Sequence, residues 1–278
     1  MKHRDGFFGG VRGSKNYHQC WLPEGPPKAV LLLVHGLAEH CGRYTNLIVH
    51  FVQRGYAVYG LDHVGHGKSD GARNYVECFN DFIEPLRTYI GMVRERQAGV
   101  PIFLVGHSLG GLIGATFLLD HQDSLQGAIL SGPAVTIPDN ISPAIIFVGR
   151  ILSALIPRIG ILGIDPRGVS RDPAVVAAYV DDPLVYKGKT TARLGAEMLK
   201  SMQHLRTEAH RIRLPMLILQ GGADKLVDPA GARVLHDLIG SKDRTLIVYE
   251  GLYHEVYNEP EHKRVLGDVE SWLGTRLP

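Results

Sequence analysis

The chain has 278 residues, of which 45% are hydrophobic and 21% are charged, and its formal net charge is +2. These values are typical of a folded globular protein and exclude a disordered or a fibrous chain. The charges are spread along the sequence and do not gather in basic runs interleaved with aromatic residues, so nucleic acid is not expected as a partner. The sequence does not indicate an oligomeric state.

The cysteines indicate neither a disulfide framework nor a metal site. Cys20, Cys41 and Cys78 are an odd number, and they lack CxxC or Cys/His spacing. No HExxH cluster is present, so neither a metal nor a cofactor is implied. The N-terminus lacks the continuous apolar stretch of a secretory signal, which makes the cytoplasm the default expectation.

Apolar runs of strand length alternate with stretches of helical periodicity. Such alternation predicts an α/β fold with a mostly parallel sheet covered by helices on both faces. A weaker antiparallel edge is predicted at residues 6–10 and 17–22. The strands are predicted at 29–34, 57–61, 102–105, 127–130, 216–220 and 245–249, and the helices at 81–97, 109–121, 229–239 and 260–273.

The alternation lapses between about residues 136 and 206. This region has helical pattern and many prolines but no convincing strand. We therefore expect a core made of residues 1–135 and 207–278, and a mainly helical cap or lid at 136–206. Within the cap, residues 141–162 are rich in Ile, Leu and Ala, but two arginines and two prolines interrupt them short of a membrane-spanning helix.

Ser108 is the predicted nucleophile. It is the centre of a GxSxG pattern, Gly106-His107-Ser108-Leu109-Gly110, that follows a predicted strand and opens a predicted helix. Glycines on both sides allow the strand and helix to approach each other at the strained turn that exposes the serine. The pattern alone is weak, because 33 glycines produce it by chance, and its position in the chain carries the prediction.

His254 is the predicted general base. A serine hydroxyl needs a histidine to take its proton and return it to the leaving alcohol. In this fold the order along the chain is serine, acid and then histidine after the last strand. Of the 14 histidines, only His254 directly follows the strand predicted at 245–249.

The orienting acid has two candidates after the strand at 216–220. Asp224 is nearer to the strand end, whereas Asp228 precedes Pro229, where a helix would use it as a cap. Asp224 is therefore favoured to hold the imidazole Nδ1–H in place.

Two backbone N–H groups are predicted to bind the negative oxygen of the tetrahedral intermediate. One belongs to Leu109, directly after the nucleophile. The other belongs to Leu37, which follows His35-Gly36 at the end of an early strand.

These residues resemble the monoacylglycerol lipase branch of the α/β-hydrolases, also known as serine aminopeptidase-like or lysophospholipase-type hydrolases. The similarity covers most of the chain. The matching segments are HGLAEHCGRY at 35–44, LDHVGHGKSD at 61–70, GHSLGG at 106–111, DPL at 182–184, QGGAD at 220–224 and YEGLYH at 249–254.

The resemblance implies an α/β-hydrolase fold, a triad of Ser108, Asp224 and His254, and oxyanion donors at Leu37 and Leu109. It also implies that Glu39, Arg43 and Tyr179 lie near the glycerol hydroxyls of a monoacylglycerol.

Two positions depart from the family pattern. Mammalian members carry a cysteine shortly after the acid, where this chain has Leu226-Val227, and a polar histidine after the catalytic one is replaced by Tyr257. The resemblance therefore does not carry the inhibitor behaviour and head-group preference of the mammalian members over to this chain.

The cap is expected to supply an apolar tunnel for the acyl chain. Its aliphatic residues are too many for one buried stripe, so we expect an apolar face that contacts membranes or micelles peripherally. They are Ile145, Ile146, Val148, Ile151, Leu152, Leu155 and Ile156.

The residues alone leave alternatives open. A lysophospholipase, a general carboxylesterase and an acyltransferase share the same acyl-enzyme chemistry. A non-catalytic lipid-binding protein of the same fold would lack a triad member, and all three are present here.

Overall fold

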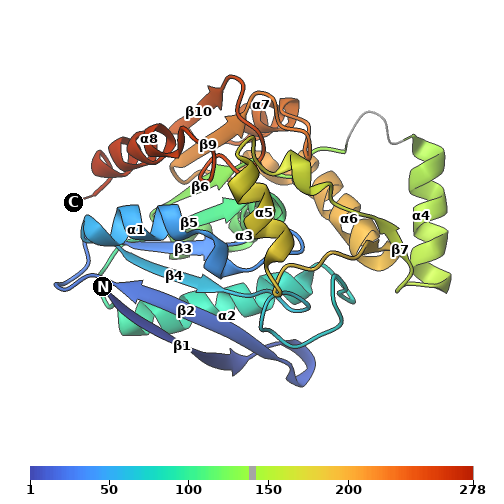
Figure 1. Ribbon diagram of the computed structural model, residues 1–278, viewed down its shortest axis with the longest axis horizontal. Coiled ribbons are helices and arrows are strands. Elements are labelled where there is room, and N and C mark those ends of the chain that lie inside the picture. Colours follow the sequence, from blue (N-terminus) through green and yellow to red (C-terminus); the bar gives the residue numbers. More distant parts are fainter. Residues whose placement is uncertain (138–141, 278) are drawn as a thin grey trace.

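The computed structural model describes residues 1–137 and 142–277 (Figure 1). Its main feature is an eight-stranded sheet in the order β1-β2-β4-β3-β5-β6-β9-β10. β1 pairs antiparallel with β2, β2 pairs antiparallel with β4, and the remaining pairs are parallel. The strands are β1 (Lys2–Gly9), β2 (Lys15–Leu22), β3 (Val30–Val34), β4 (Ala57–Leu61), β5 (Ile102–His107), β6 (Gly127–Ser131), β9 (Met216–Gly221) and β10 (Arg244–Tyr249).

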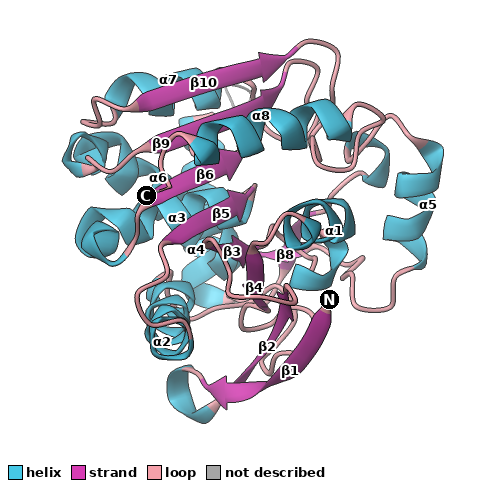
Figure 2. Cartoon of the chain, turned by 90° about the vertical axis from the view of Figure 1, so that its left-hand side faces the viewer, coloured by secondary structure: helices cyan, strands magenta, loops and turns pink. Residues whose placement is uncertain are grey.

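Helices cover both faces of this sheet (Figure 2). α1 (Thr45–Gln53) and α8 (His262–Gly274) pack on one face, and α2 (Asn80–Arg96), α3 (Leu109–His121) and α7 (Ala230–Leu238) pack on the other. Side chains of the central strand β3 alternate between the two layers: Leu31 and Leu33 join the α1/α8 layer, and Leu32 joins the opposite one. The apolar run of β3 is therefore buried on both sides, as in other parallel sheets.

The predicted α/β class is confirmed, with small differences at the ends of the elements. Helix α3 has the predicted bounds, and the edge strands β1 and β2 are longer than predicted. Helix α1 was not singled out in the sequence, although four of its nine residues are buried hydrophobics that pack on the sheet. Short 3-10 helices lie in the connections: η1 (Val11–Gly13), η2 (Cys41–Arg43), η3 (Gln122–Ser124), η4 (Pro166–Gly168) and η5 (Ala209–Arg211).

The segment between β6 and β9 is mainly helical, with α4 (Pro143–Leu155), α5 (Pro173–Asp181) and α6 (Ala192–Glu208). Contrary to the expectation of no strand, β7 (Gly160–Leu162) and β8 (Thr190–Thr191) form a short antiparallel pair. Helix α4 packs against α6, which itself packs on α3 of the core. The division into a core and a cap at 136–206 stays a prediction, and its start includes residues 138–141, which lie outside the described residues.

Across residues 1–137 and 142–277, no helix combines the length and the apolar character needed to cross a membrane.

Candidate active site

Ser108 lies at a sharp turn between β5 and α3, because β5 ends at His107 and α3 begins at Leu109. Its backbone has φ 55° and ψ −118°, an uncommon conformation for a residue with a Cβ. Such strain costs on the order of 1–3 kcal/mol and persists only where neighbouring structure imposes it. Here the Ser108 N–H donates to the carbonyl of Ser131 at 3.0 Å, and the Ser108 carbonyl accepts from the amides of Gly111, Leu112 and Ala134.

Two glycines allow this turn to form, as the sequence predicted. A Cβ on Gly110 would lie 1.9 Å from the carbonyl oxygen of Val34, and a Cβ on Gly106 would lie 2.6 Å from that of Gly110. Any side chain at either position would separate α3 from the sheet. The glycines therefore bring the serine close to the strand ends.

His254 and Asp224 are joined by a hydrogen bond. His254 lies in the loop after β10, Asp224 lies in the loop after β9, and Nδ1 of the histidine is 2.7 Å from Oδ2 of the aspartate. The buried carboxylate also accepts from Nε2 of Gln220 and from the amides of Leu226 and Val227. Four donors thus fix its orientation.

His254 also lies beside the Ser108 turn. Its ring centroid is 4.6 Å from that of His107, the residue before the serine. A Cβ on Gly132, which follows β6, would lie 3.0 Å from Nδ1 of His254. Ser108 and His254 line one cavity, so the structure brings these two predicted residues to the same site.

The electrostatics of the pair favour an imidazole that takes up a proton. Burial alone lowers the pKa of His254, but the charge and the hydrogen bond of Asp224 outweigh it, and the net shift is upward. Burial alone raises the pKa of Asp224, but His254 and two backbone amides lower it by more. The net pKa is therefore lowered, and the carboxylate stays ionised. By contrast, burial and the neighbouring His254 lower the pKa of His107 to about 4, which keeps that ring neutral.

The other acid candidate serves the helix that follows it. Oδ1 of Asp228 accepts from the amide of Ala230, the first residue of α7, at 2.9 Å. This is the capping role expected from its position before Pro229.

The predicted oxyanion donors flank the serine. A Cβ on Gly36 would lie 3.2 Å from Cβ of Ser108, so the loop after β3 runs directly against the nucleophile. Leu37 and Leu109 both line the cavity. Within the described part of the chain, neither of their N–H groups donates to a protein acceptor. Both remain available to a negative oxygen.

A buried charge network borders the site. Arg43 Nη1 lies 2.7 Å from Oε2 of Glu39 and 2.7 Å from Oε1 of Glu255, and Nη2 binds the second oxygen of Glu255. Oε1 of Glu39 accepts from the Tyr44 hydroxyl and from the amide of Gly36. Burial raises the pKa of Glu39, but Arg43 and its other neighbours reverse the shift, and the net pKa is lowered.

The three residues assigned to the glycerol head group are not equivalent. Glu39 and Tyr179 line the cavity together with Ser108, whereas Arg43 lies behind them, with its guanidinium carbon 4.6 Å from the Tyr179 ring centroid. The Tyr179 hydroxyl makes no hydrogen bond within residues 1–137 and 142–277.

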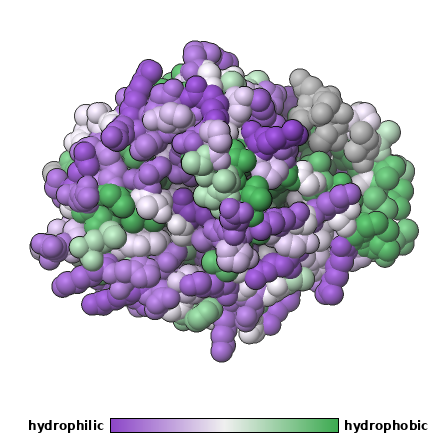
Figure 3. All heavy atoms as spheres, viewed as in Figure 1, coloured by the Kyte–Doolittle hydropathy of each residue, from purple (hydrophilic) through white to green (hydrophobic). Residues whose placement is uncertain are grey.

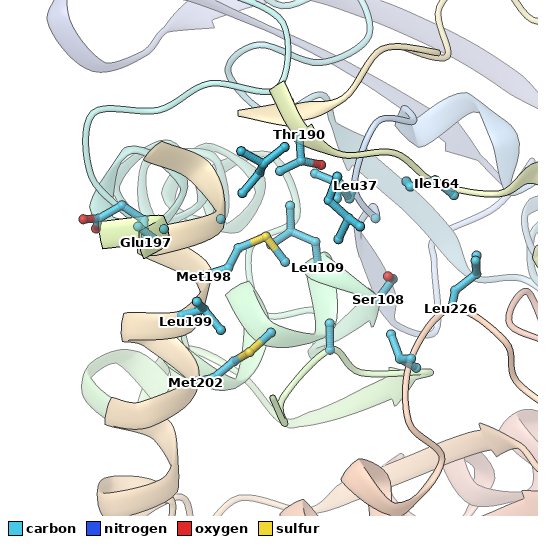
Figure 4. A pocket seen from close by; sticks show the side chains of 18 of the residues that line it. Leu37, Ser108, Leu109, Ile164, Thr190, Glu197, Met198, Leu199, Met202 and Leu226 are labelled. Atoms are coloured by element: carbon cyan, nitrogen blue, oxygen red, sulfur yellow. The ribbon is translucent and has the colours of Figure 1, made fainter. Parts of the chain in front are cut away.

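The cavity has a volume of about 840 Å³, in the upper range of small-molecule pockets. Figure 4 shows Ser108 at one side and the methionines of α6 at the other. Helix α4 contributes Ile146, Val148 and Leu152 to the wall. The remaining apolar lining includes Leu37, Leu109, Ile164, Met198, Leu199, Met202, Leu226 and Val227.

Sequence reasoning missed several residues that support the site. Glu255 and Gln220 hold Arg43 and Asp224, and His107 packs against His254. Glu255 directly follows His254, and His107 directly precedes Ser108. Their position next to a predicted catalytic residue is the sequence feature that could have identified them. No group of three or more His, Cys, Asp or Glu side chains among the described residues is arranged to hold a metal ion.

The sheet order, the covering helices and a strained serine between β5 and α3 define the class of this protein, which is the α/β hydrolases. The model of the family described as serine aminopeptidase, S33, matches residues 25–261, and the chain belongs to this family.

Several relatives match nearly the whole chain. A protein of Mycolicibacterium smegmatis named monoacylglycerol lipase is 40% identical over 270 residues, which cover 97% of this chain and 96% of that protein. A monoglyceride lipase of Rattus norvegicus is 35% identical, with 96% and 90% covered. The crystal structure of the monoacylglycerol lipase of Paleococcus ferrophilus superposes with a TM-score of 0.82 at 30% identity, covering 99% of this chain and 100% of that chain.

Proposed function

We propose that this protein is a serine hydrolase that cleaves the ester bond of monoacylglycerols to glycerol and a free fatty acid. The observation that carries the proposal is an apolar cavity that opens onto Ser108 beside the hydrogen-bonded pair of His254 and Asp224. The names of the relatives support the substrate class.

The reaction follows from the roles of three side chains. His254 takes the proton of the Ser108 hydroxyl while Oγ forms a bond to the ester carbonyl carbon. Asp224 holds the imidazole by its Nδ1–H and stabilises the imidazolium. The C–O bond to glycerol then breaks, and the proton on His254 passes to the leaving oxygen. A water molecule, activated by the same imidazole, hydrolyses the acyl-enzyme and releases the fatty acid.

The amides of Leu37 and Leu109 bind the oxyanion in both steps. Both residues line the cavity that contains Ser108, and neither N–H group has a competing acceptor among the described residues, which supports this assignment. Preorganised donors of this kind are worth about 10²- to 10³-fold in kcat each.

The glycerol head group binds next to Ser108. The Tyr179 hydroxyl and the Glu39 carboxylate, which line the cavity, would form hydrogen bonds with the glycerol hydroxyls. Arg43 acts through Glu39 and Glu255, because its guanidinium is already paired with both.

The acyl chain occupies the apolar part of the cavity under α4 and beside α6. Each buried methylene contributes about 0.8 kcal/mol to binding. A long acyl chain therefore supplies the main binding energy, and the small polar head supplies the orientation.

The outer face of α4 and the following turn form an exposed apolar patch, which we assign to peripheral contact with a lipid surface. Phe147 is 63% exposed and Leu155 is 76% exposed, and green atoms gather over this part of the molecule in Figure 3. Ile141 and the side chain of Ile145, which the sequence placed in this region, lie outside the described residues and side chains. The exposed hydrophobics of the patch are Phe147, Ile151, Leu155, Ile156 and Ile159, whereas Val148, Ile161 and Leu162 are exposed residues that also line the cavity. A monoacylglycerol molecule would leave the lipid surface at this patch and enter the cavity beside it.

The test compares the hydrolysis of 1-monoacylglycerol, diacylglycerol, lysophospholipid and short p-nitrophenyl esters over a series of acyl lengths. We expect the highest kcat/KM for a long-chain monoacylglycerol. Equal or better turnover of diacylglycerol would overturn the substrate class, and a preference for lysophospholipid or for short esters would favour a lysophospholipase or a general carboxylesterase. Absence of all turnover would point to a lipid-binding protein.

A further inference from the structure

We propose that the segment after α5, residues 182–186, positions the oxyanion loop at residues 36–40, and that Asp182 is the positioning residue that holds the two together. The inference rests on the proposed function, because it concerns the orientation of the Leu37 amide in that reaction. Neither Asp182 nor Tyr186 lines the cavity within the described part of the chain. Their effect is therefore exerted through the loop.

The oxyanion loop has an unusual backbone at the residue after its donor. Ala38 has φ 63°, in the left-handed region that residues with a Cβ rarely adopt. The peptide unit between Leu37 and Ala38 is thus set by a conformation that the chain does not favour by itself, and outside contacts must maintain it.

The first outside contact is a backbone hydrogen bond from the cap. The amide of Tyr186 donates to the carbonyl oxygen of Ala38 at 2.8 Å. This bond fixes the peptide unit between Ala38 and Glu39, two units along the chain from the unit that carries the Leu37 N–H.

The second contact is between His40 and Asp182. Nδ1 of His40 accepts from the amide of Gly42 at 3.2 Å, so the ring proton is on Nε2, which lies 2.9 Å from Oδ2 of Asp182. The two side chains are only 11% and 22% exposed. The other carboxylate oxygen of Asp182 accepts from the amide of Leu184 at 2.8 Å and shapes the turn that leads to Tyr186.

Asp182 therefore supports both contacts. One carboxylate oxygen binds His40, the last residue of the oxyanion loop. The other oxygen binds the Leu184 amide and so orders the turn before Tyr186, whose amide donates to Ala38. Among the described residues, the segment is also held from its own side: the Gly36 amide donates to Oε1 of Glu39, and Nδ1 of His35 lies 2.8 Å from the Gly36 carbonyl oxygen, which belongs to the peptide unit that carries the Leu37 N–H. Loss of the Asp182 carboxylate should leave the loop folded but its donor less well oriented, which affects the transition state more than the ground state.

The experiment compares Asp182→Ala with Asp181→Ala, its exposed neighbour, whose side chain makes no hydrogen bond or ion pair among the described residues. Because loss of a whole oxyanion donor costs about 10²- to 10³-fold, we expect Asp182→Ala to lower kcat about tenfold, with KM within about twofold of the wild type. The inhibition constant of a long-chain alkyl trifluoromethyl ketone, which forms a tetrahedral adduct with the serine, should rise by a similar factor. That of the product fatty acid should not change.

Two further variants separate positioning from a general loss of structure. Asp182→Asn keeps one acceptor oxygen, so its kcat should fall between those of the wild type and Asp182→Ala. The double variant of Asp182→Ala and His40→Ala should be no slower than the slower single variant, because both remove the same contact. All assays are run well below the unfolding midpoint of each variant.

The inference is overturned if Asp182→Ala matches Asp181→Ala in kcat and in affinity for the ketone, if KM absorbs the whole effect, or if the two single effects add. Ser108→Ala is measured in parallel. Inactive Ser108→Ala with unaffected Asp182→Ala would reject this inference alone, whereas an active Ser108→Ala would reject the proposed function.

Discussion

His254 and Asp224 illustrate how one hydrogen bond sets the state of a reacting side chain. A neutral imidazole that carries its proton on Nδ1 has a free Nε2, which is the nitrogen that must accept a proton from Ser108. The 2.7 Å bond to Asp224 selects this tautomer, and the buried carboxylate raises the pKa of the imidazole. The charge of Glu255, the next residue in the chain, acts in the same direction.

Replacing Asp224 by asparagine should therefore change both the rate and its pH dependence. The proposed reaction needs neutral His254, so kcat/KM should rise with pH through the pKa of His254, which is raised above its usual 6.5. Asp224→Asn removes the charge that raises this pKa, so the acid limb should move to lower pH while kcat falls by about 10⁴-fold. The check is a pH–rate profile, with Asp228→Asn as the control. An acid limb that stays in place would mean that Asp224 does not act on His254.

The sequence can predict the placement of the three proposed reacting residues, because this placement depends on chain order and on strand ends. Ser108, Asp224 and His254 each follow a strand, and parallel strands end at the same edge of a sheet. The supporting network was not predictable in this way. Arg43 and Glu255 are 212 residues apart, and their pairing depends on which side chains face each other in the folded molecule.

At the scale of the elements, the approach of α3 to β3 and β5 is the critical packing. Helix α3 begins at Leu109, directly after the nucleophile. It approaches the sheet closely because Gly110 of the helix and Gly106 of β5 have no side chain. The strain at Ser108 is maintained by this packing and by the carbonyl of Ser131.

Gly110→Ala should disrupt this packing, since its Cβ would lie 1.9 Å from the carbonyl oxygen of Val34. We expect a loss of at least about 1–3 kcal/mol in the free energy of unfolding, together with loss of activity. Urea unfolding and ester hydrolysis provide the measurements. Gly91→Ala, in the exposed part of α2 where a Cβ meets no atom within 4 Å, should instead stabilise the protein by about 0.5–1 kcal/mol. Wild-type stability and activity in Gly110→Ala would refute the role given to this glycine.

The long elements were predictable from periodicity, and the short ones were not. Apolar patterns of helix or strand length predict the bounds of α3 and the six strands of the parallel part of the sheet. β7 and β8 have three and two residues, and they pair across 27 intervening residues, so their existence depends on how the segment between β6 and β9 folds. Helix α1 is nine residues long and its N-cap makes no side-chain hydrogen bond, so it lacks a start signal in the sequence.

At the scale of the whole molecule, α4 has two apolar faces, one toward the cavity and one toward solvent. Its inner face lines the cavity that contains Ser108, and its outer face exposes large hydrophobic side chains at the edge of the molecule (Figure 3). A monomeric globular protein rarely exposes a large contiguous apolar patch without a binding role.

The proposed lipid contact can be tested by flotation with phosphatidylcholine vesicles. We expect the wild type to float with the vesicles and the double variant of Phe147→Asp and Leu155→Asp to remain at the bottom, because two charges would enter the lipid interface. Hydrolysis of a short soluble ester should stay within about twofold of the wild type, since neither residue lines the described cavity. Phe7→Asp, an exposed aromatic on β1, is the control. A wild type that does not float would remove the membrane proposal without affecting the esterase proposal.

The central claim is that Ser108 forms the acyl-enzyme in monoacylglycerol hydrolysis, and the most direct measurement is the turnover of a long-chain 1-monoacylglycerol by Ser108→Ala. The serine makes no side-chain hydrogen bond among the described residues, so its removal should leave the fold intact. We predict a loss of about four to six orders of magnitude in kcat, as for other triad nucleophiles. Near-normal turnover in a correctly folded Ser108→Ala protein would contradict the account.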